Sequence, residues 1–142
     1  YGPRQSNRAI IPTVITQILN GKKEIKLGSL HPTRDFNFVS DTVNGYVKSL
    51  KKGKIEGKII NLGTNYEVSI LEVTNLIIKI FDKKIMLTQD DQRIRPKKSE
   101  VERLISDNSL AQDLLGWKPE FNGKLGLKKG LIKWSIYGRP GA

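Results

Sequence analysis

The chain has 142 residues, of which 37% are hydrophobic and 27% are charged, a composition typical of one folded soluble domain. It contains no cysteine and one histidine, His31, which excludes disulfides, thiolate metal sites and a histidine metal cluster. It shows neither a run of about 18 apolar residues nor a signal-peptide pattern. We therefore expect a cytoplasmic protein with no membrane partner and no metal site.

The formal net charge of +11 raises the question of nucleic acid. The lysines are spread along the chain rather than concentrated in one basic helix, and no zinc-finger spacing or aromatic RNA-binding signature occurs. The charge therefore indicates a solvated basic surface. A basic nucleic-acid-binding module remains an alternative from another functional class.

The first half of the chain predicts two helices and three short strands. A helix is expected over residues 10–20, with Pro12 in its first turn and Gly21 as its stop. A second helix is expected over residues 41–51, capped by Ser40 or Asp41. The predicted strands cover residues 24–27, 36–39 and 58–62, and the last of these is the most apolar.

In the second half, Ser69 and Glu72 form a capping-box sequence that predicts a helix reaching Phe81. Two further strands are expected over residues 84–88 and 101–106. The sequence Asp107-Asn108-Ser109 is expected to cap a short helix that stops at Gly116, and the final helix is expected over residues 125–137.

Alternating strands and helices predict an α/β fold with some parallel strand pairs. Only the strand at residues 58–62 has the apolar character of a central strand, so its neighbours are expected in a part of the protein outside this chain. The turn sequence at Tyr1-Gly2-Pro3 likewise suggests a piece of a longer protein. A protein-interaction domain that docks a partner on the 59–62 strand is a further alternative.

The motifs of a complete active site are not found in the sequence. There is no G-x-G-x-x-G or G-x-x-x-x-G-K-[ST] phosphate loop and no G-x-S-x-G nucleophile turn. None of Tyr46, Tyr66 and Tyr137 is followed by a lysine four residues later. The paired acids Asp90 and Asp91 fit a solvated loop better than acid–base catalysis. We therefore expect no catalytic residue in this chain.

Three arginines beside predicted strands, Arg34, Arg95 and Arg103, are the candidate binding groups. A planar guanidinium donates in a fork that matches phosphate, so two or three converging arginines could hold a diphosphate. The alternative for Arg34 is an ordinary ion pair with a neighbouring acid.

Several motifs, in order, resemble a known family. They are Tyr1-Gly2-Pro3-Arg4-Gln5, Ile11-Pro12, the stretch 34–41, Asn61-Leu62-Gly63, Arg95-Pro96, 106–109 and 115–119. Together they are similar to the C-terminal half of the extended short-chain dehydrogenase/reductases, the NAD-dependent nucleotide-sugar epimerases and 4,6-dehydratases. The exact amino-acid sequences of these motifs most resemble those of the N-acetylglucosamine-nucleotide 4,6-dehydratases of legionaminic acid biosynthesis.

The resemblance implies a C-terminal substrate-binding lobe over residues 1–137, together with the last elements of an NAD(P)-binding Rossmann fold whose N-terminal half lies outside this chain. Residues 138–142 are expected to be a disordered tail. The full enzyme would bind NAD and a nucleotide-diphosphate sugar, and we expect it to be a homodimer. It would oxidise C4 of the sugar, eliminate water across C5–C6 and reduce C6. A nucleotide-sugar 4-epimerase is the alternative, and the base of the nucleotide stays open.

The resemblance also implies roles for particular residues. Arg34, with Arg95 or Arg103, would bind the diphosphate; Gln5, Ser6 and Arg8 would border the sugar, and Asn65 would approach the nucleotide. Tyr1, Gly2 and Pro3 would lie near the nicotinamide. The family's catalytic tyrosine and lysine precede the first residue of this sequence.

Overall fold

The computed structural model describes residues 1–90, 92 and 100–137. Its elements in chain order are α1 (Ile10–Leu19), β1 (Glu24–Leu27), β2 (Thr33–Asp35), α2 (Val39–Lys51), β3 (Glu67–Ser69), α3 (Ile70–Ile80), β4 (Met86–Gln89), β5 (Arg103–Leu104), α4 (Ser109–Leu115) and α5 (Gly123–Tyr137). The predicted α/β fold is confirmed.

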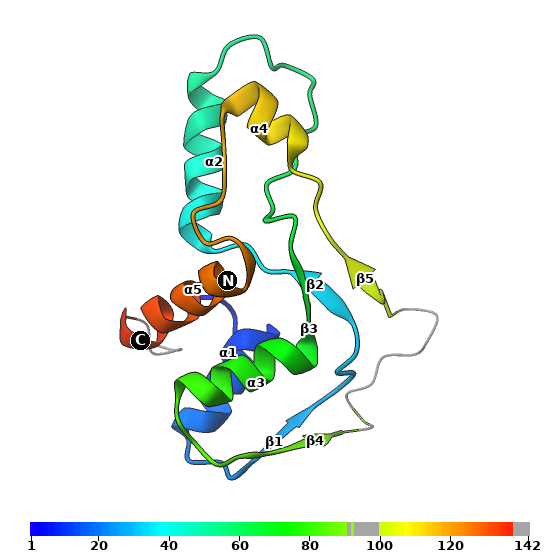
Figure 1. Ribbon diagram of the computed structural model, residues 1–142, viewed down its shortest axis with the longest axis vertical. Coiled ribbons are helices and arrows are strands. Elements are labelled where there is room, and N and C mark those ends of the chain that lie inside the picture. The colour runs from blue at the N-terminus through cyan, green and yellow to red at the C-terminus, as the bar shows by residue number, and fades with distance from the viewer. Residues whose placement is uncertain (91, 93–99, 138–142) are drawn as a thin grey trace.

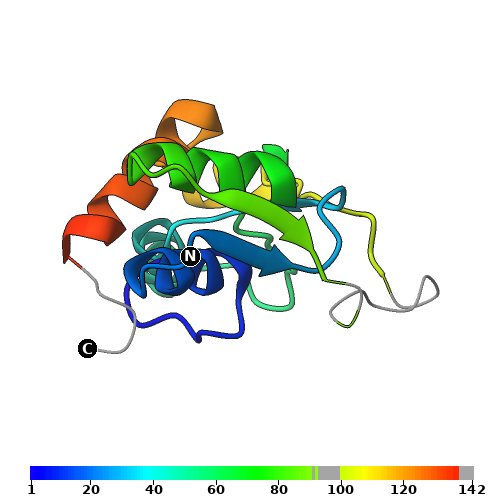
Figure 2. The same cartoon turned by 90° about the horizontal axis from the view of Figure 1, so that it is seen from below.

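The strands form two small sheets. β1 pairs with β4 in parallel, and the two run side by side in Figure 2. The second sheet has the order β3-β2-β5, with β2 antiparallel to β3 and parallel to β5. Both parallel pairs are formed by strands far apart in the chain, as the alternating pattern predicted.

The main core lies between α1, β1, α3 and α5. Its buried members include Ile11, Val14, Ile15, Ile18, Ile25, Val73, Ile77, Leu127, Leu131 and Trp134. Except for Ile25, which lies on β1, these residues follow the 3.6-residue period of their helices. Leu19, the last residue of α1, is 50% exposed.

A second, smaller cluster holds α4 to the other end of the molecule, where α2 and α4 lie side by side (Figure 1). It is built from Ala111, Leu115 and Trp117, with Ile60 and Leu62 packed against it. The Trp117 ring is fully buried, and its indole N–H donates to the backbone oxygen of Asp41 at 2.9 Å. The segment after α4 is thereby tied to the first turn of α2.

The capping box predicted at Ser69 is confirmed. The Glu72 amide donates to the Ser69 hydroxyl at 3.1 Å, and the Ser69 amide donates back to the Glu72 carboxylate at 2.8 Å. The left-handed stop at Gly116 is also confirmed, with a φ of 56° that favours glycine.

The predicted strand at residues 36–39 is wrong, because β2 covers Thr33–Asp35 and α2 already begins at Val39. Instead of joining a ladder, Phe38 packs its ring against Tyr1 and Phe121. Neither Ser40 nor Asp41 caps α2: the N-cap is Phe38, with no side-chain cap. The Asp41 carboxylate instead accepts from the Glu120 and Phe121 amides at 3.1 and 3.0 Å.

The predicted strand at residues 58–62 forms no ladder among the described residues. Ile59 there is 86% exposed, whereas Ile60 and Leu62 pack on the small cluster. Val43, Val47 and Leu50 share one face of α2 by their spacing, yet Val43 is 54% and Leu50 86% exposed. The periodicity of α2 is therefore correct, but its apolar face is uncovered in this chain.

Candidate functional site

Arg34 lies on β2, the central strand of the three-stranded sheet, and its side chain is only 22% exposed. One terminal N–H group donates to the Thr33 backbone oxygen at 2.7 Å, and the other reaches a Glu100 carboxylate oxygen at 3.2 Å. The ion-pair alternative for Arg34 is therefore realised, with Glu100 rather than Asp35 as the partner. A guanidinium has five N–H donors, so several remain for an anion.

Arg103 is held in a tighter arrangement on β5. Its Nε donates to both Glu67 carboxylate oxygens at 2.8 Å, and its Nη2 lies 2.6 Å from Oε1. The Thr33 hydroxyl donates to the same carboxylate at 2.7 Å. Hydrogen bonds from Arg103 and then Thr33 lower the pKa of Glu67, and Glu67 in turn raises the pKa of Arg103.

The sheet register separates the two arginines. Thr33 is directly opposite Arg103, whereas Arg34 is opposite Leu104 and Val68. Because side chains alternate along a strand and cross-strand partners share a face, Arg34 and Arg103 lie on opposite faces of the sheet. The expected convergence of Arg34 with Arg103 is therefore not formed in this structure. Arg95 lies outside the described residues, and the roles of all three arginines as diphosphate ligands stay predictions.

Asp35 organises the loops beside Arg34, a role that the sequence did not reveal. Its Oδ1 accepts from the Thr64 amide at 3.0 Å and the Thr64 hydroxyl at 2.6 Å. Its Oδ2 accepts from the Asn65 amide at 3.0 Å and the Ser106 amide at 3.3 Å. One carboxylate thus joins the loop after residue 62 to the segment after β5.

This junction is closely packed at Gly63. A Cβ atom there would lie 2.3 Å from the Ser106 Cβ and 2.9 Å from the Asp35 Oδ2, which leaves no room for a side chain. Asn108 closes the other side, donating its amide to the Gly63 backbone oxygen at 2.7 Å. Asn65 follows with a φ of 55° and an exposed side chain. The Asn-Leu-Gly motif therefore sets the loop that presents Asn65.

The opening turn packs against the same region. The Tyr1 ring meets Phe38 edge-on at a centroid distance of 5.1 Å, and its hydroxyl donates to the Leu127 backbone oxygen at 3.2 Å. Burial, with a smaller contribution from Asp41, raises the pKa of the Tyr1 hydroxyl, so it stays protonated. Gly2 lies against Val39, where a Cβ would come within 2.5 Å of the valine side chain. The expected position of Tyr1, Gly2 and Pro3 near the nicotinamide stays a prediction.

Gln5, Ser6 and Arg8 follow on the loop before α1. Ser6 and Arg8 are exposed, and the Arg8 amide donates to the Ser6 hydroxyl at 3.4 Å. The side-chain oxygen of Gln5 is buried and has no hydrogen-bond partner among the described residues. A buried acceptor of this kind requires a water or a ligand group. Of these three residues, Gln5 is therefore the one with a buried hydrogen-bond acceptor available to a ligand.

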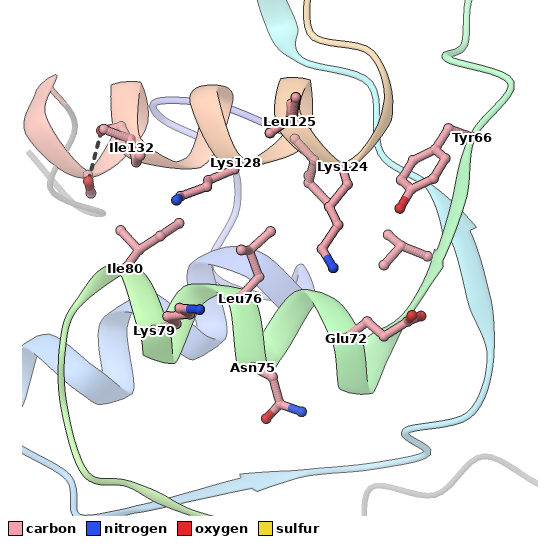
Figure 3. Close-up of a pocket in the computed structure, with 13 residues that line it drawn as sticks. Tyr66, Glu72, Asn75, Leu76, Lys79, Ile80, Lys124, Leu125, Lys128 and Ile132 are labelled. Carbon is pink, nitrogen blue, oxygen red and sulfur yellow. Dashed lines mark hydrogen bonds between the residues drawn. The ribbon is translucent and has the colours of Figure 1, made fainter.

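Two hollows are found among the described residues, and neither is lined by Arg34 or Arg103. A polar one of about 280 Å³ is lined by Thr64, Asn65, Asn108, Gln112, Lys118 and Asn122, with Pro119. Of the predicted site residues only Asn65 borders it. A larger cavity of about 930 Å³ lies between α3 and α5 (Figure 3), and no predicted site residue lines it.

The pyrophosphate of a dinucleotide is commonly bound at a glycine-rich turn from a strand into a helix, whose amides face the phosphates. The sequence has no such motif, and the turn at which β3 leads directly into α3, at Ser69 and Ile70, contains no glycine. No hydride-transfer step is therefore assigned to these residues. In the described part of the chain, no group of three or more acidic, histidine or cysteine side chains could hold a metal ion.

The matches of this chain to known proteins give its class: the NAD-dependent extended short-chain dehydrogenase/reductases, which include nucleotide-sugar epimerases and dehydratases. The GDP-mannose 4,6 dehydratase family model matches residues 1–129, so the chain belongs to that family. The resemblance seen in the sequence is thus confirmed at the level of the family.

Individual relatives agree. The chain is 30% identical to human dTDP-D-glucose 4,6-dehydratase and 28% identical to GDP-6-deoxy-D-mannose reductase of Pseudomonas aeruginosa, each over 94% of its length. It spans only 38% and 44% of these two relatives. It also superposes with a TM-score of 0.83, at 30% identity, on UDP-glucuronic acid 4-epimerase from Bacillus cereus in complex with UDP-glucuronic acid and NAD. That match covers 96% of this chain and 41% of the epimerase.

Among the described residues, no helix is long and apolar enough to cross a membrane.

Proposed function

We propose that this chain is the nucleotide-sugar-binding portion of an NAD-dependent nucleotide-sugar 4,6-dehydratase. The observation that carries the proposal is Arg34, a half-buried arginine on the central strand of a sheet, with guanidinium donors left over from its Glu100 contact. Asp35 and Gly63 fix the loops beside it. In this role Arg34 binds the diphosphate of the substrate through its remaining N–H groups.

Two further features support a substrate lobe. Gln5 keeps a buried oxygen without a partner among the described residues, as a group that bonds a sugar hydroxyl would. The dehydratase relatives span the same residues at about 30% identity. More specifically, we propose that the sugar is N-acetylglucosamine, as in the legionaminic acid enzymes. This part of the proposal is based on the amino-acid sequences of the motifs.

A nucleotide-sugar 4-epimerase is the second candidate. It is favoured by the match to the Bacillus cereus epimerase, with its TM-score of 0.83. Both reactions begin with oxidation at C4, so the residues described here would serve either enzyme. The residues that decide between them lie outside this chain.

We also propose that an N-terminal Rossmann portion of the parent protein covers the exposed face of α2. This face, defined here as Val43, Tyr46, Val47 and Leu50, is continuous in sequence period and between 42% and 86% exposed. The uncovered segment 58–62 would then join the edge of that portion's sheet as a strand. The expected homodimer of the parent stays a prediction.

The test is calorimetric titration of the chain with UDP-, GDP- and dTDP-sugars. Arg34→Ala should weaken nucleotide-sugar affinity roughly 10- to 100-fold, because charge-assisted hydrogen bonds contribute about 1.5–3 kcal/mol. Arg103→Ala removes the same kind of group from the opposite face of the sheet, so a loss of affinity in that variant would support the predicted role of Arg103 as a second diphosphate ligand. Lys129→Ala controls for the loss of one positive charge.

Equal affinity in the wild type and the Arg34→Ala variant would contradict the proposed role of Arg34. An equal loss in Arg34→Ala and Arg103→Ala would show that both faces of the sheet reach the ligand. If the folded wild-type chain binds none of the nucleotide sugars, the isolated chain is not an autonomous substrate lobe.

A further inference from the structure

The cavity between α3 and α5 has a two-part lining that the proposed function does not use. Apolar side chains form its floor: Val68 and Leu127 are buried, and Leu76, Ile80 and Ile132 are partly buried. In Figure 3, Leu76 and Ile80 point from α3 toward α5. Its volume of about 930 Å³ is within the range of small-molecule sites.

The rim of this cavity is basic. Lys79 comes from α3, and Lys124 and Lys128 come from α5, where their four-residue spacing places them on one helix face. Figure 3 shows Lys124 reaching from α5 toward α3. Among the described residues none of these three ammonium groups forms an ion pair, and Lys124 and Lys128 repel each other.

The one acid at the rim, Glu72, does not neutralise these lysines. Its carboxylate is engaged in the capping box, where it accepts from the Ser69 amide at 2.8 Å and from the Ser69 hydroxyl at 2.6 Å. These bonds, with a smaller contribution from Lys124, lower the pKa of Glu72. With Glu72 ionised, the rim still carries an excess of two positive charges.

The geometry points to a second binding site here, for a small amphipathic anion with an aliphatic chain and a carboxylate or phosphate head. The chain would lie on the floor of Leu76, Ile80 and Ile132, and the head would lie between Lys124, Lys128 and Lys79. The aliphatic floor, with Tyr66 as its only aromatic side chain, favours a flexible hydrocarbon over a planar ring. The site shares no residue with the proposed nucleotide-sugar site.

The experiment titrates the 142-residue chain with dodecanoate and with dodecyl phosphate as monomers, below their micelle-forming concentrations. We expect saturable one-site binding by calorimetry, with amide shifts in the NMR spectrum at Leu76, Ile80 and Leu127. Shortening dodecanoate to decanoate should weaken binding roughly two- to fourfold per methylene, and acetate should not bind. The stronger of the two heads identifies the natural source as a fatty acid or a phosphate-bearing lipid.

The Lys124→Ala/Lys128→Ala variant should bind roughly 4- to 25-fold more weakly, at about two- to fivefold per exposed charge. Lys129→Ala, on the same helix but outside the cavity, is the matched control and should bind as the wild type does. All three lysines are exposed, so the variants should fold normally.

The inference is overturned if the double variant and the control bind equally, or if the shifts lie away from α3 and α5. It is also overturned if the monomers do not bind, or if only vesicles of anionic lipid do, which would indicate a membrane-binding surface. Arg34→Ala should leave dodecanoate binding unchanged, so failure here is distinct from failure of the nucleotide-sugar proposal.

Discussion

Two adjacent residues on β2, Arg34 and Asp35, have different surroundings: Arg34 is the proposed ligand of the diphosphate, and Asp35 holds two loops. Arg34 has N–H donors left over for an anion, whereas the Asp35 carboxylate accepts hydrogen bonds from four donors in two loops. An arginine next to an aspartate in the sequence most simply predicts an ion pair between the two. The structure shows that each residue has different partners, because neighbouring side chains on a strand point to opposite faces.

Replacing Asp35 by alanine should be costly, because it leaves the Thr64, Asn65 and Ser106 amides without their acceptor. We expect a loss of about 2–4 kcal/mol in the free energy of unfolding, measured by urea denaturation. Asp107→Ala is the matched control: this exposed carboxylate accepts from the Ser109 amide at 2.9 Å and should cost about 1 kcal/mol or less. Equal losses in the two variants would contradict the organising role of Asp35.

The Glu67–Arg103 pair predicts a pH dependence of stability. The folded-state pKa of Glu67 is lowered by Arg103 and Thr33, so its stabilising contribution is complete above the unfolded value of about 4.3. The contribution is lost as the pH falls through the lower folded-state pKa. Urea midpoints of wild type and Glu67→Gln should therefore differ at pH 7 and converge in acid. A difference between the two midpoints that stays unchanged from neutral pH into strong acid would contradict this assignment.

Among the elements, α2 has the least covered apolar face. Its inward side, at Asp41 and Gly45, is buried, whereas Val43, Tyr46, Val47 and Leu50 are open. An apolar face of this extent on a lone chain favours association. The proposed Rossmann portion would remove this face from water.

Leu50→Glu should reduce self-association of the isolated chain, because it places a charge at the most exposed position of the α2 face. Sedimentation velocity over a range of concentrations measures the effect. Leu19→Glu is the matched control, since Leu19 is a 50% exposed leucine on α1, outside the α2 face. A wild-type chain that stays monomeric at high concentration would argue against a docking role for α2.

Local signals predicted the elements that depend on their own sequence. The capping box at Ser69, the glycine stop at Gly116 and the apolar period of α1 and α5 all appear as expected. Residues 36–39, predicted as a strand, form none, and residues 58–62 have strand propensity but form no ladder among the described residues. A strand is completed by hydrogen bonds to a neighbour, so alternation alone cannot guarantee one.

At the scale of the whole molecule, the chain is two packed clusters joined by the β3-β2-β5 sheet, and it spans about two-fifths of its relatives. Asp35 and the Trp117–Asp41 bond connect these parts across the chain. The net charge of +11 is a property of the whole molecule: its long-range field changes the affinity for charged ligands without forming a specific contact.

Salt dependence separates the nucleotide-sugar proposal from the nucleic-acid alternative. Affinity for a nucleotide sugar should fall only modestly between low and high salt, because it depends on a few partly buried contacts. Affinity for a DNA or RNA duplex would fall log-linearly and steeply, and would hardly respond to Arg34→Ala. Fluorescence anisotropy at several salt concentrations, with a labelled nucleotide and a labelled duplex, measures both.

The sequence by itself determined the family, the α/β class and the helices, because motif order, periodicity and capping are local properties of the chain. The tertiary structure alone decided which groups meet: Arg34 with Glu100, Arg103 with Glu67, and Asp35 with two loops. Sheet register set these partners by placing Arg34 and Arg103 on opposite faces. It arises from pairing between distant strands, which no local pattern encodes.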